Sequence, residues 1–164
     1  MLRATQKGGP LIFRQSLSIL GGQLTEFRMA APFRYPYTIA LHDTDAAGVV
    51  FSPQIFRICH QAYEAMMESI GLSLGSILEH RRFGLPVTHL EGDYFKPLTV
   101  GDKIDVTVSV ESIGSSSYTI AYEWRMDGEV QARAKTVHVC VNTQNLNSTP
   151  LPDALKAALV RYSA

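Results

Sequence analysis

One long apolar helix, followed by segments with strand periodicity, constrains the fold of this chain more than any other feature. Between residues 53 and 70, apolar side chains recur at helical spacing and give one broad hydrophobic face. Ser52 suits an N-cap, Pro53 the first helical position and Gly71 the residue after the helix. The pattern predicts a helix of about 18 residues, which must pack its apolar face against another layer, most simply a sheet.

Alternation of apolar and polar residues predicts strands on both sides of this helix. One strand precedes it at residues 35–41, and others follow at residues 87–96, 103–113, 117–126 and 129–142. Asp127-Gly128, between the last two, is a strong hairpin signal. Short helices are also expected at residues 73–80 and after Pro152. A strand, a long helix and then antiparallel strands make an α+β fold.

The composition limits the class of protein. A chain of 164 residues that is 46% hydrophobic fits one domain with a sizeable core. A formal net charge of zero gives no global electrostatic basis for binding nucleic acid. No apolar run reaches the ~20 residues that a membrane-spanning helix needs. Cys59 and Cys140 both lie in apolar segments, so we expect buried thiols in a reduced, cytoplasmic protein rather than a disulfide framework.

Residues 1–32 differ from the rest of the chain. Four basic residues in the first 28 stand against one acid, Glu26, among Ser, Thr, Gly and Gln. This composition mildly resembles a transit peptide, and it equally fits an upstream mis-start before Met29, a natural disordered arm or an expression remnant. We therefore expect an N-terminal extension over residues 1–32, disordered or non-native, and one folded domain over residues 33–164.

An acidic turn precedes the long helix, in the sequence His42-Asp43-Thr44-Asp45-Ala46-Ala47-Gly48-Val49-Val50-Phe51-Ser52. Free backbone N–H groups at a helix start can hold a developing oxyanion. A carboxylate beside them can attack a carbonyl or deprotonate water. Aspartate is also common in turns, so a purely structural role is the alternative for both acids.

The run Asp-Thr-Asp-Ala-Ala-Gly-Val-Val-Phe, followed by a helix, resembles the signature of hotdog-fold acyl-CoA thioesterases of the 4-hydroxybenzoyl-CoA type. The resemblance runs from about Tyr37 to the C-terminal segment. Two narrower stretches look like the branch that hydrolyses 1,4-dihydroxy-2-naphthoyl-CoA in phylloquinone and menaquinone biosynthesis. They are Cys59-His60-Gln61-Ala62-Tyr63-Glu64 and Leu85-Pro86-Val87-Thr88-His89.

This resemblance implies a hotdog fold, in which a curled antiparallel sheet wraps around one long central helix. It also implies an enzyme that hydrolyses an aryl-CoA thioester. The alternatives are a thioesterase for 4-hydroxybenzoyl-CoA or short-chain acyl-CoA, and a non-catalytic hotdog protein that binds acyl groups.

The family's catalytic acid is the second of the Asp-x-Asp pair, which falls on Asp45. Its oxyanion donor is a backbone N–H seven residues further on, which falls on Ser52. Asp45 would act as nucleophile or as general base, and the sequence leaves both routes open. Asp43 is expected to brace the turn. The candidate substrate-binding residues are Gly48, Phe51, His60, Glu64 and His89.

Three of these candidates have alternative roles. His60 and His89 match the naphthoyl-type pattern and would line an aryl pocket, but core or interface histidines give the same signal. A sister branch uses a helix glutamate for catalysis. Glu64 lies about 16 Å along the axis from the helix start, so it would serve a neighbouring subunit's site, or simply be solvated or paired.

No cofactor is expected, because coenzyme A is part of the substrate. No metal is expected either, because the histidines lack metal-ligand spacing. Gly114-Ser115-Ser116-Ser117 replaces the family's basic cluster, so the CoA phosphates are left to Lys96, Lys103, Arg133 or backbone amides. Because a lone curled sheet exposes an edge, the resemblance implies at least a homodimer, and a homotetramer is expected.

Overall fold

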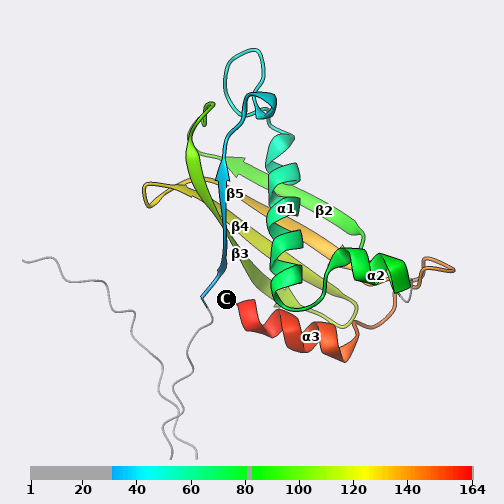
Figure 1. Ribbon diagram of the computed structural model, residues 1–164. Helices are drawn as coiled ribbons and strands as arrows, with labels where there is room; N and C mark the ends of the chain where they lie inside the picture. Colours follow the sequence, from blue (N-terminus) through cyan, green and yellow to red (C-terminus); the bar gives the residue numbers. More distant parts are fainter. Residues whose placement is uncertain (1–30, 81–82, 164) are drawn as a thin grey trace, which may run out of the picture.

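The long helix lies in the hollow of a curled five-stranded sheet (Figure 1). The computed structural model describes residues 31–80 and 83–163, so nearly all of the expected N-terminal extension lies outside the described residues. Within the described ranges, no helix is both long enough and apolar enough to cross a membrane. The predicted α+β class and the wrapped arrangement of sheet and helix are confirmed.

Every neighbouring pair of strands in the sheet is antiparallel, and the spatial order is β1-β3-β4-β5-β2. The strands are β1 (Phe33–Thr38), β2 (Val87–Tyr94), β3 (Lys103–Ile113), β4 (Ser117–Met126) and β5 (Glu129–Val139). β3 and β4 have the predicted bounds, whereas β2 and β5 end earlier than predicted. The prediction of a first strand reaching Leu41 is wrong, because the chain enters a 3₁₀ turn at Leu41–Asp43 and exposes the Leu41 side chain.

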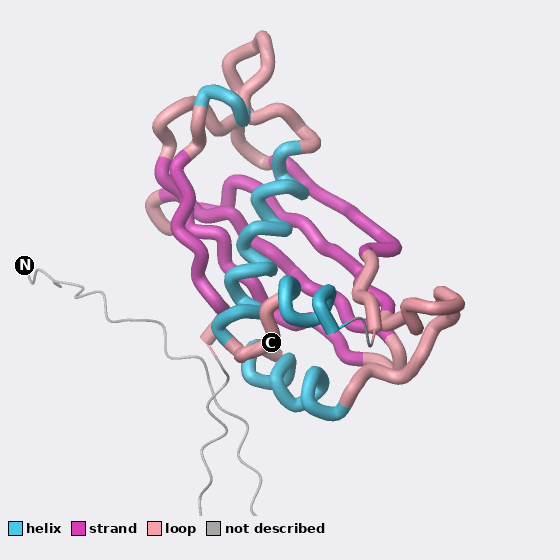
Figure 2. Tube along the Cα trace, turned by 45° about the vertical axis from the view of Figure 1, so that its right-hand side comes forward, coloured by secondary structure: helices cyan, strands magenta, loops and turns pink. Residues whose placement is uncertain are grey.

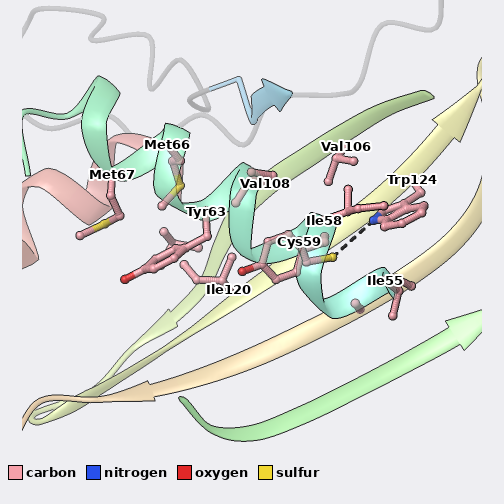
Figure 3. Close-up of a cluster of buried hydrophobic side chains, with 14 of the residues drawn as sticks. Ile55, Ile58, Cys59, Tyr63, Met66, Met67, Val106, Val108, Ile120 and Trp124 are labelled. Atoms are coloured by element: carbon pink, nitrogen blue, oxygen red, sulfur yellow. Dashed lines mark hydrogen bonds between the residues drawn. The ribbon is translucent and has the colours of Figure 1, made fainter. Parts of the chain in front are cut away.

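The core is formed where helix α1 (Gln54–Ser69) meets the inner face of the sheet. Fully buried side chains from α1 contact this face, among them Ile55, Ile58, Cys59, Tyr63, Met66 and Met67 (Figure 3). The sheet contributes Val106, Val108, Ile120 and Trp124. Burying one large apolar side chain is worth about 1.5–3 kcal/mol, so this contact fixes the position of α1 on the sheet.

The two ends of α1 differ from each other. The predicted Ser52 N-cap is wrong: Pro53 occupies the cap position with helical dihedrals, and no side chain caps the helix. The proline ring already fixes φ in the helical range, so the chain turns into the helix there. At the other end, Gly71 has φ +80° and the Leu72 amide donates to the Met67 carbonyl at 2.9 Å, which confirms the predicted glycine stop.

Helices α2 (Leu74–His80) and α3 (Asp153–Leu159) lie at the C-terminal end of α1, and a 3₁₀ turn follows at Val160–Tyr162 (Figure 2). The acidic turn lies at the opposite end of α1 (Figure 1). The Asp127-Gly128 hairpin is confirmed, with φ of +51° and +83° at its two residues. Cys59 and Cys140 are buried and unpaired, as predicted.

Candidate active site

The acidic turn is anchored by the buried carboxylate of Asp43. It accepts hydrogen bonds from the Ala40 amide and the Tyr37 hydroxyl, each at 2.9 Å, and it forms an ion pair with Arg57 of α1. Burial alone would raise the pKa of Asp43, but these hydrogen bonds and the Arg57 charge outweigh it and hold the pKa below its usual range. Asp43 therefore braces the turn as an ionised group.

Arg57 links this turn to the first turns of α1. Besides Asp43, its guanidinium donates to Gln54, Gln61 and the Tyr37 hydroxyl. The planar guanidinium has five donors in fixed directions, and here it uses them on two segments at once. The start of the helix and the segment before Asp45 are therefore held in one geometry.

Asp45 lies in a tight loop beyond this anchor. Its amide donates to the Val49 carbonyl at 3.0 Å, and the Gly48 amide donates back to the Asp45 carbonyl at 2.9 Å. One carboxylate oxygen accepts the Ala47 amide at 2.8 Å. The second oxygen accepts no hydrogen bond from any described residue, so it is available to a substrate or a water molecule. Gly48, with φ +78°, occupies the left-handed conformation that this loop requires.

Asp45 and Ser52 line the same cavity, which has a volume of about 470 Å³. Most of the remaining lining is apolar: Val49, Val50, Phe51, Ile55, Tyr94, Phe95, Pro97, Leu98, Trp124 and Ala132. Trp124 is held by its indole N–H, which donates to the Cys59 thiol at 3.3 Å (Figure 3). Burial raises the pKa of Cys59 to about 12, so this thiol remains protonated.

The backbone N–H of Ser52 donates to no group among the described residues. The carbonyl of the same peptide unit, that of Phe51, accepts the Gln54 amide of α1 at 2.8 Å. Because the carbonyl and N–H of a trans peptide point in opposite directions, the Ser52 N–H points away from the body of the helix. Pro53 has no N–H to offer. Ser52 therefore presents a free donor at the positive end of the helix dipole.

The predicted substrate-binding residues are only partly brought together. Phe51 lines the cavity, whereas Gly48 lies in the adjoining loop. His60 and Glu64 lie one turn apart on α1 with their side chains half exposed, and His60 Nε2 lies 3.3 Å from Glu64 Oε1. Neither lines the Asp45 cavity, and Glu64 is paired within the protomer.

His89 lies on the opposite face of the sheet from α1. It pairs with Val137 of β5, and its ring nitrogen lies 3.4 Å from Glu91. Successive residues of a strand point to opposite faces of the sheet. A Cβ at Gly92 would lie 3.4 Å from the Phe56 ring of α1, so position 92 faces α1. His89, three residues earlier, therefore faces away from α1. One protomer therefore does not bring His89 to the Asp45 cavity or to the α1 face that carries His60.

Sequence reasoning missed Tyr94 and Trp124 as cavity residues. Tyr94 ends β2 opposite Ala132, close to the start of α1, and its hydroxyl donates to the Ser52 carbonyl at 2.5 Å. Among the basic residues considered for the CoA phosphates, Lys96 lines the cavity. It also pairs with Glu129 at 2.5 Å.

Comparisons with known proteins agree with this fold. The 1,4-dihydroxy-2-naphthoyl-CoA hydrolase of Rippkaea orientalis is 39% identical over 124 residues, which cover 74% of this chain and 90% of that protein. The hydrolase of the same name from Synechococcus elongatus is 34% identical over 127 residues, 77% and 93% of the two chains. The solved structure of a 1,4-dihydroxy-2-naphthoyl-CoA thioesterase from Synechocystis superposes with a TM-score of 0.74 at 34% identity, covering 77% of this chain and 94% of that one. Residues 39–159 match the Thioesterase-like superfamily, and the chain belongs to this family of hotdog-fold enzymes.

Proposed function

We propose that this protein hydrolyses 1,4-dihydroxy-2-naphthoyl-CoA to 1,4-dihydroxy-2-naphthoate and CoA, a step in phylloquinone or menaquinone biosynthesis. The observation that carries the proposal is that Asp45 and Ser52, whose N–H has no partner among the described residues, line one largely apolar cavity. The named activity of the cyanobacterial relatives supports the choice of acyl group.

The chemistry begins with the thioester carbonyl oxygen at the Ser52 amide. As negative charge develops on that oxygen, this N–H and the dipole of α1 stabilise it. Removing one such donor typically costs about 2.7–4 kcal/mol of transition-state stabilisation. Asp45 lines the same cavity, and in this proposal its second carboxylate oxygen acts on the carbonyl carbon directly or through water.

Both routes for Asp45 account for the bonds that form and break, the proton and the leaving thiolate. In the first, Asp45 attacks the carbonyl carbon, an acyl–aspartyl anhydride forms and CoA leaves as thiolate; water then cleaves the anhydride and restores the carboxylate. In the second, Asp45 takes a proton from water, the resulting hydroxide attacks, and the proton passes to the departing thiolate. Because Ala47 orients one carboxylate oxygen, the same second oxygen serves either route.

The lining of the cavity suits a flat aromatic acyl group, because the aromatic residues Phe51, Tyr94 and Trp124 are among those that line it. Aromatic pairs in offset or edge-to-face arrangement gain about 0.5–1.5 kcal/mol beyond the area they bury. A bicyclic naphthoyl ring gains more from such walls than a short aliphatic chain does.

The working unit we propose is a homodimer, assembled into a homotetramer. β2 is an edge strand whose side chains are almost all exposed in one protomer, Val87 and Leu90 among them. Such an edge invites pairing. A second chain at this edge would bring residues of β2, including His89, and the exposed side of α1 that carries His60 near a partner's cavity. Two unpaired thiols fit a cytoplasmic location.

The test is a substrate panel on the purified protein. CoA release is followed with a thiol reagent for 1,4-dihydroxy-2-naphthoyl-CoA, 4-hydroxybenzoyl-CoA and hexanoyl-CoA. The proposal predicts kcat/KM for the naphthoyl thioester at least about 10-fold above the other two, equivalent to about 1.4 kcal/mol. A preference for another thioester would reassign the substrate, and binding of all three without thiol release would make this an acyl-binding protein.

A further inference from the structure

Tyr94 connects the edge strand of the sheet to the peptide beside the proposed oxyanion donor. It is the last residue of β2, and its pairing with Ala132 directs the ring to the inner face of the sheet. From there it reaches the segment before α1, where its hydroxyl donates to the Ser52 carbonyl at 2.5 Å. Tyr94, which is distant in sequence, thus makes a direct hydrogen bond to Ser52, the residue whose N–H is the proposed oxyanion donor.

The peptide between Ser52 and Pro53 depends on this contact. Proline has no N–H, so the Ser52 carbonyl is the only hydrogen-bonding group through which that peptide can be held. Its backbone partner, the Ile55 amide, lies 3.4 Å away, at the outer limit for such a bond. The short bond from Tyr94 is therefore the main one that fixes this peptide.

The neighbouring peptides are fixed by backbone groups instead. The Phe51 amide donates to the Asp43 carbonyl at 2.8 Å, and the Phe51 carbonyl accepts the Gln54 amide at 2.8 Å. Among the described residues, the bond from Tyr94 is the one side-chain hydrogen bond to the two peptide groups on either side of the Ser52 Cα. A substitution can therefore remove it without changing the backbone.

We propose that Tyr94 is a positioning residue: it holds the Ser52 carbonyl and so aims the Ser52 N–H at the thioester oxygen. This inference rests on the function proposed above. Burial, and to a lesser extent Cys59, raises the pKa of the Tyr94 hydroxyl, so it remains a donor at neutral pH. Because its proton is committed to Ser52, Tyr94 acts through that residue.

The experiment removes the hydroxyl and keeps the ring. Tyr94→Phe is compared with the parent and with Tyr35→Phe, because Tyr35 lies on β1, stacks on Tyr37 and makes no hydrogen bond through its hydroxyl to any described residue. Two readouts are taken on the full chain. One is backbone hydrogen exchange of residues 50–56 by mass spectrometry, and the other is the separation of kcat from KM.

In Tyr94→Phe, exchange in residues 50–56 should rise at least about threefold while the 126–129 hairpin is unchanged. With the aryl-CoA substrate, kcat should fall about 10-fold and KM should stay within about twofold, because the lost geometry matters in the transition state. Tyr35→Phe should match the parent in both readouts.

Three results would overturn the inference: unchanged exchange in residues 50–56, parental kcat in Tyr94→Phe, or equal effects from Tyr35→Phe. A fall in kcat without a change in exchange would give the hydroxyl a direct contact with substrate instead. If the parent hydrolyses no thioester, the proposed function and the catalytic part of this inference fail together. Hydrogen exchange still decides separately whether Tyr94 holds the Ser52 peptide.

Discussion

The backbone carbonyl of Asp43 accepts the amide of Phe51 at 2.8 Å, and this bond closes the loop that carries the proposed catalytic acid. Asp43 is buried by contacts with β1 and α1, while Phe51 is the residue before the free amide of Ser52. The two groups assigned to catalysis, Asp45 and Ser52, therefore lie on one short loop whose ends are joined at a buried ionised residue.

Replacing Asp43 should weaken the fold. Asp43→Asn removes the charge that faces Arg57 and should lower the free energy of unfolding by about 1–3 kcal/mol. This cost is smaller than for a fully buried ion pair, because the Arg57 side chain is partly exposed to solvent. The matched control is Asp105→Asn, whose carboxylate pairs with Arg34 on the surface and should change stability by less than about 1 kcal/mol. Urea unfolding at pH 7 measures both.

The difference in unfolding free energy between the parent and Asp43→Asn should depend on pH. The pKa of Asp43 is lowered in the folded state, so its contribution is present above the unfolded pKa and is lost as pH falls through the folded pKa. The gap between parent and Asp43→Asn should therefore narrow as the solution is acidified below the ordinary aspartate range. A gap that stays constant down to acid pH would contradict the role given to this carboxylate.

His138 should make the protein sensitive to mild acid. It stacks between Tyr63 and Tyr118, with ring centroids 4.4 and 5.0 Å away, and burial lowers its pKa from 6.5 to about 4. Its ring accepts from Thr136 and donates to the Leu85 carbonyl, so the neutral form is satisfied. A histidine with a depressed folded pKa favours the unfolded state as pH falls below its unfolded pKa.

Between pH 7 and pH 4.5, this histidine should cost the parent roughly 2–3 kcal/mol of unfolding free energy. His138→Gln has no titrating ring, so its stability should fall by that much less over the same interval, even if it is less stable at pH 7. Urea unfolding at the two pH values gives the comparison. Equal losses in parent and variant would show that the ring is not held neutral in the folded protein.

Ala132 should control which acyl groups fit the cavity. It lies beside Trp124 and Tyr94 on the cavity wall, and its own side chain is buried. Ala132→Leu adds bulk at this wall and should raise KM for the naphthoyl thioester by about 10-fold, with a smaller effect for hexanoyl-CoA. Ala134→Leu is the control for overpacking, because Ala134 is buried next to Gly92 and does not line the cavity. Equal losses for both thioesters would place the acyl group elsewhere.

The sequence predicted those features that depend on local periodicity. α1, β3 and β4 were found because each keeps one apolar face over many residues, and the Asp127-Gly128 hairpin because few other residues adopt two positive φ angles in succession. The loop with Asp45 and Ser52 was found through its resemblance to a family. Leu41 was misplaced because an apolar residue that continues the alternation is exposed in a turn.

The cavity walls depend on features that local patterns do not encode. Tyr94 reaches Ser52 only because β2 pairs with β5 at the sheet edge and the sheet curls toward the start of α1. His60 and His89 were grouped by motif, but the register of β2 places His89 on the outer face. The predicted N-cap at Ser52 failed because Pro53 itself takes the cap position.

The most direct measurement is the kcat/KM of Asp45→Asn with 1,4-dihydroxy-2-naphthoyl-CoA, beside the parent and Asp105→Asn. Asparagine keeps the Ala47 hydrogen bond but cannot attack the thioester or deprotonate water, so kcat/KM should fall by about 10³-fold or more while the unfolding midpoint stays near that of the parent. Asp105→Asn should retain parental activity. Hydrolysis by a folded Asp45→Asn protein within a few-fold of the parent would contradict the assignment of Asp45 as the catalytic carboxylate.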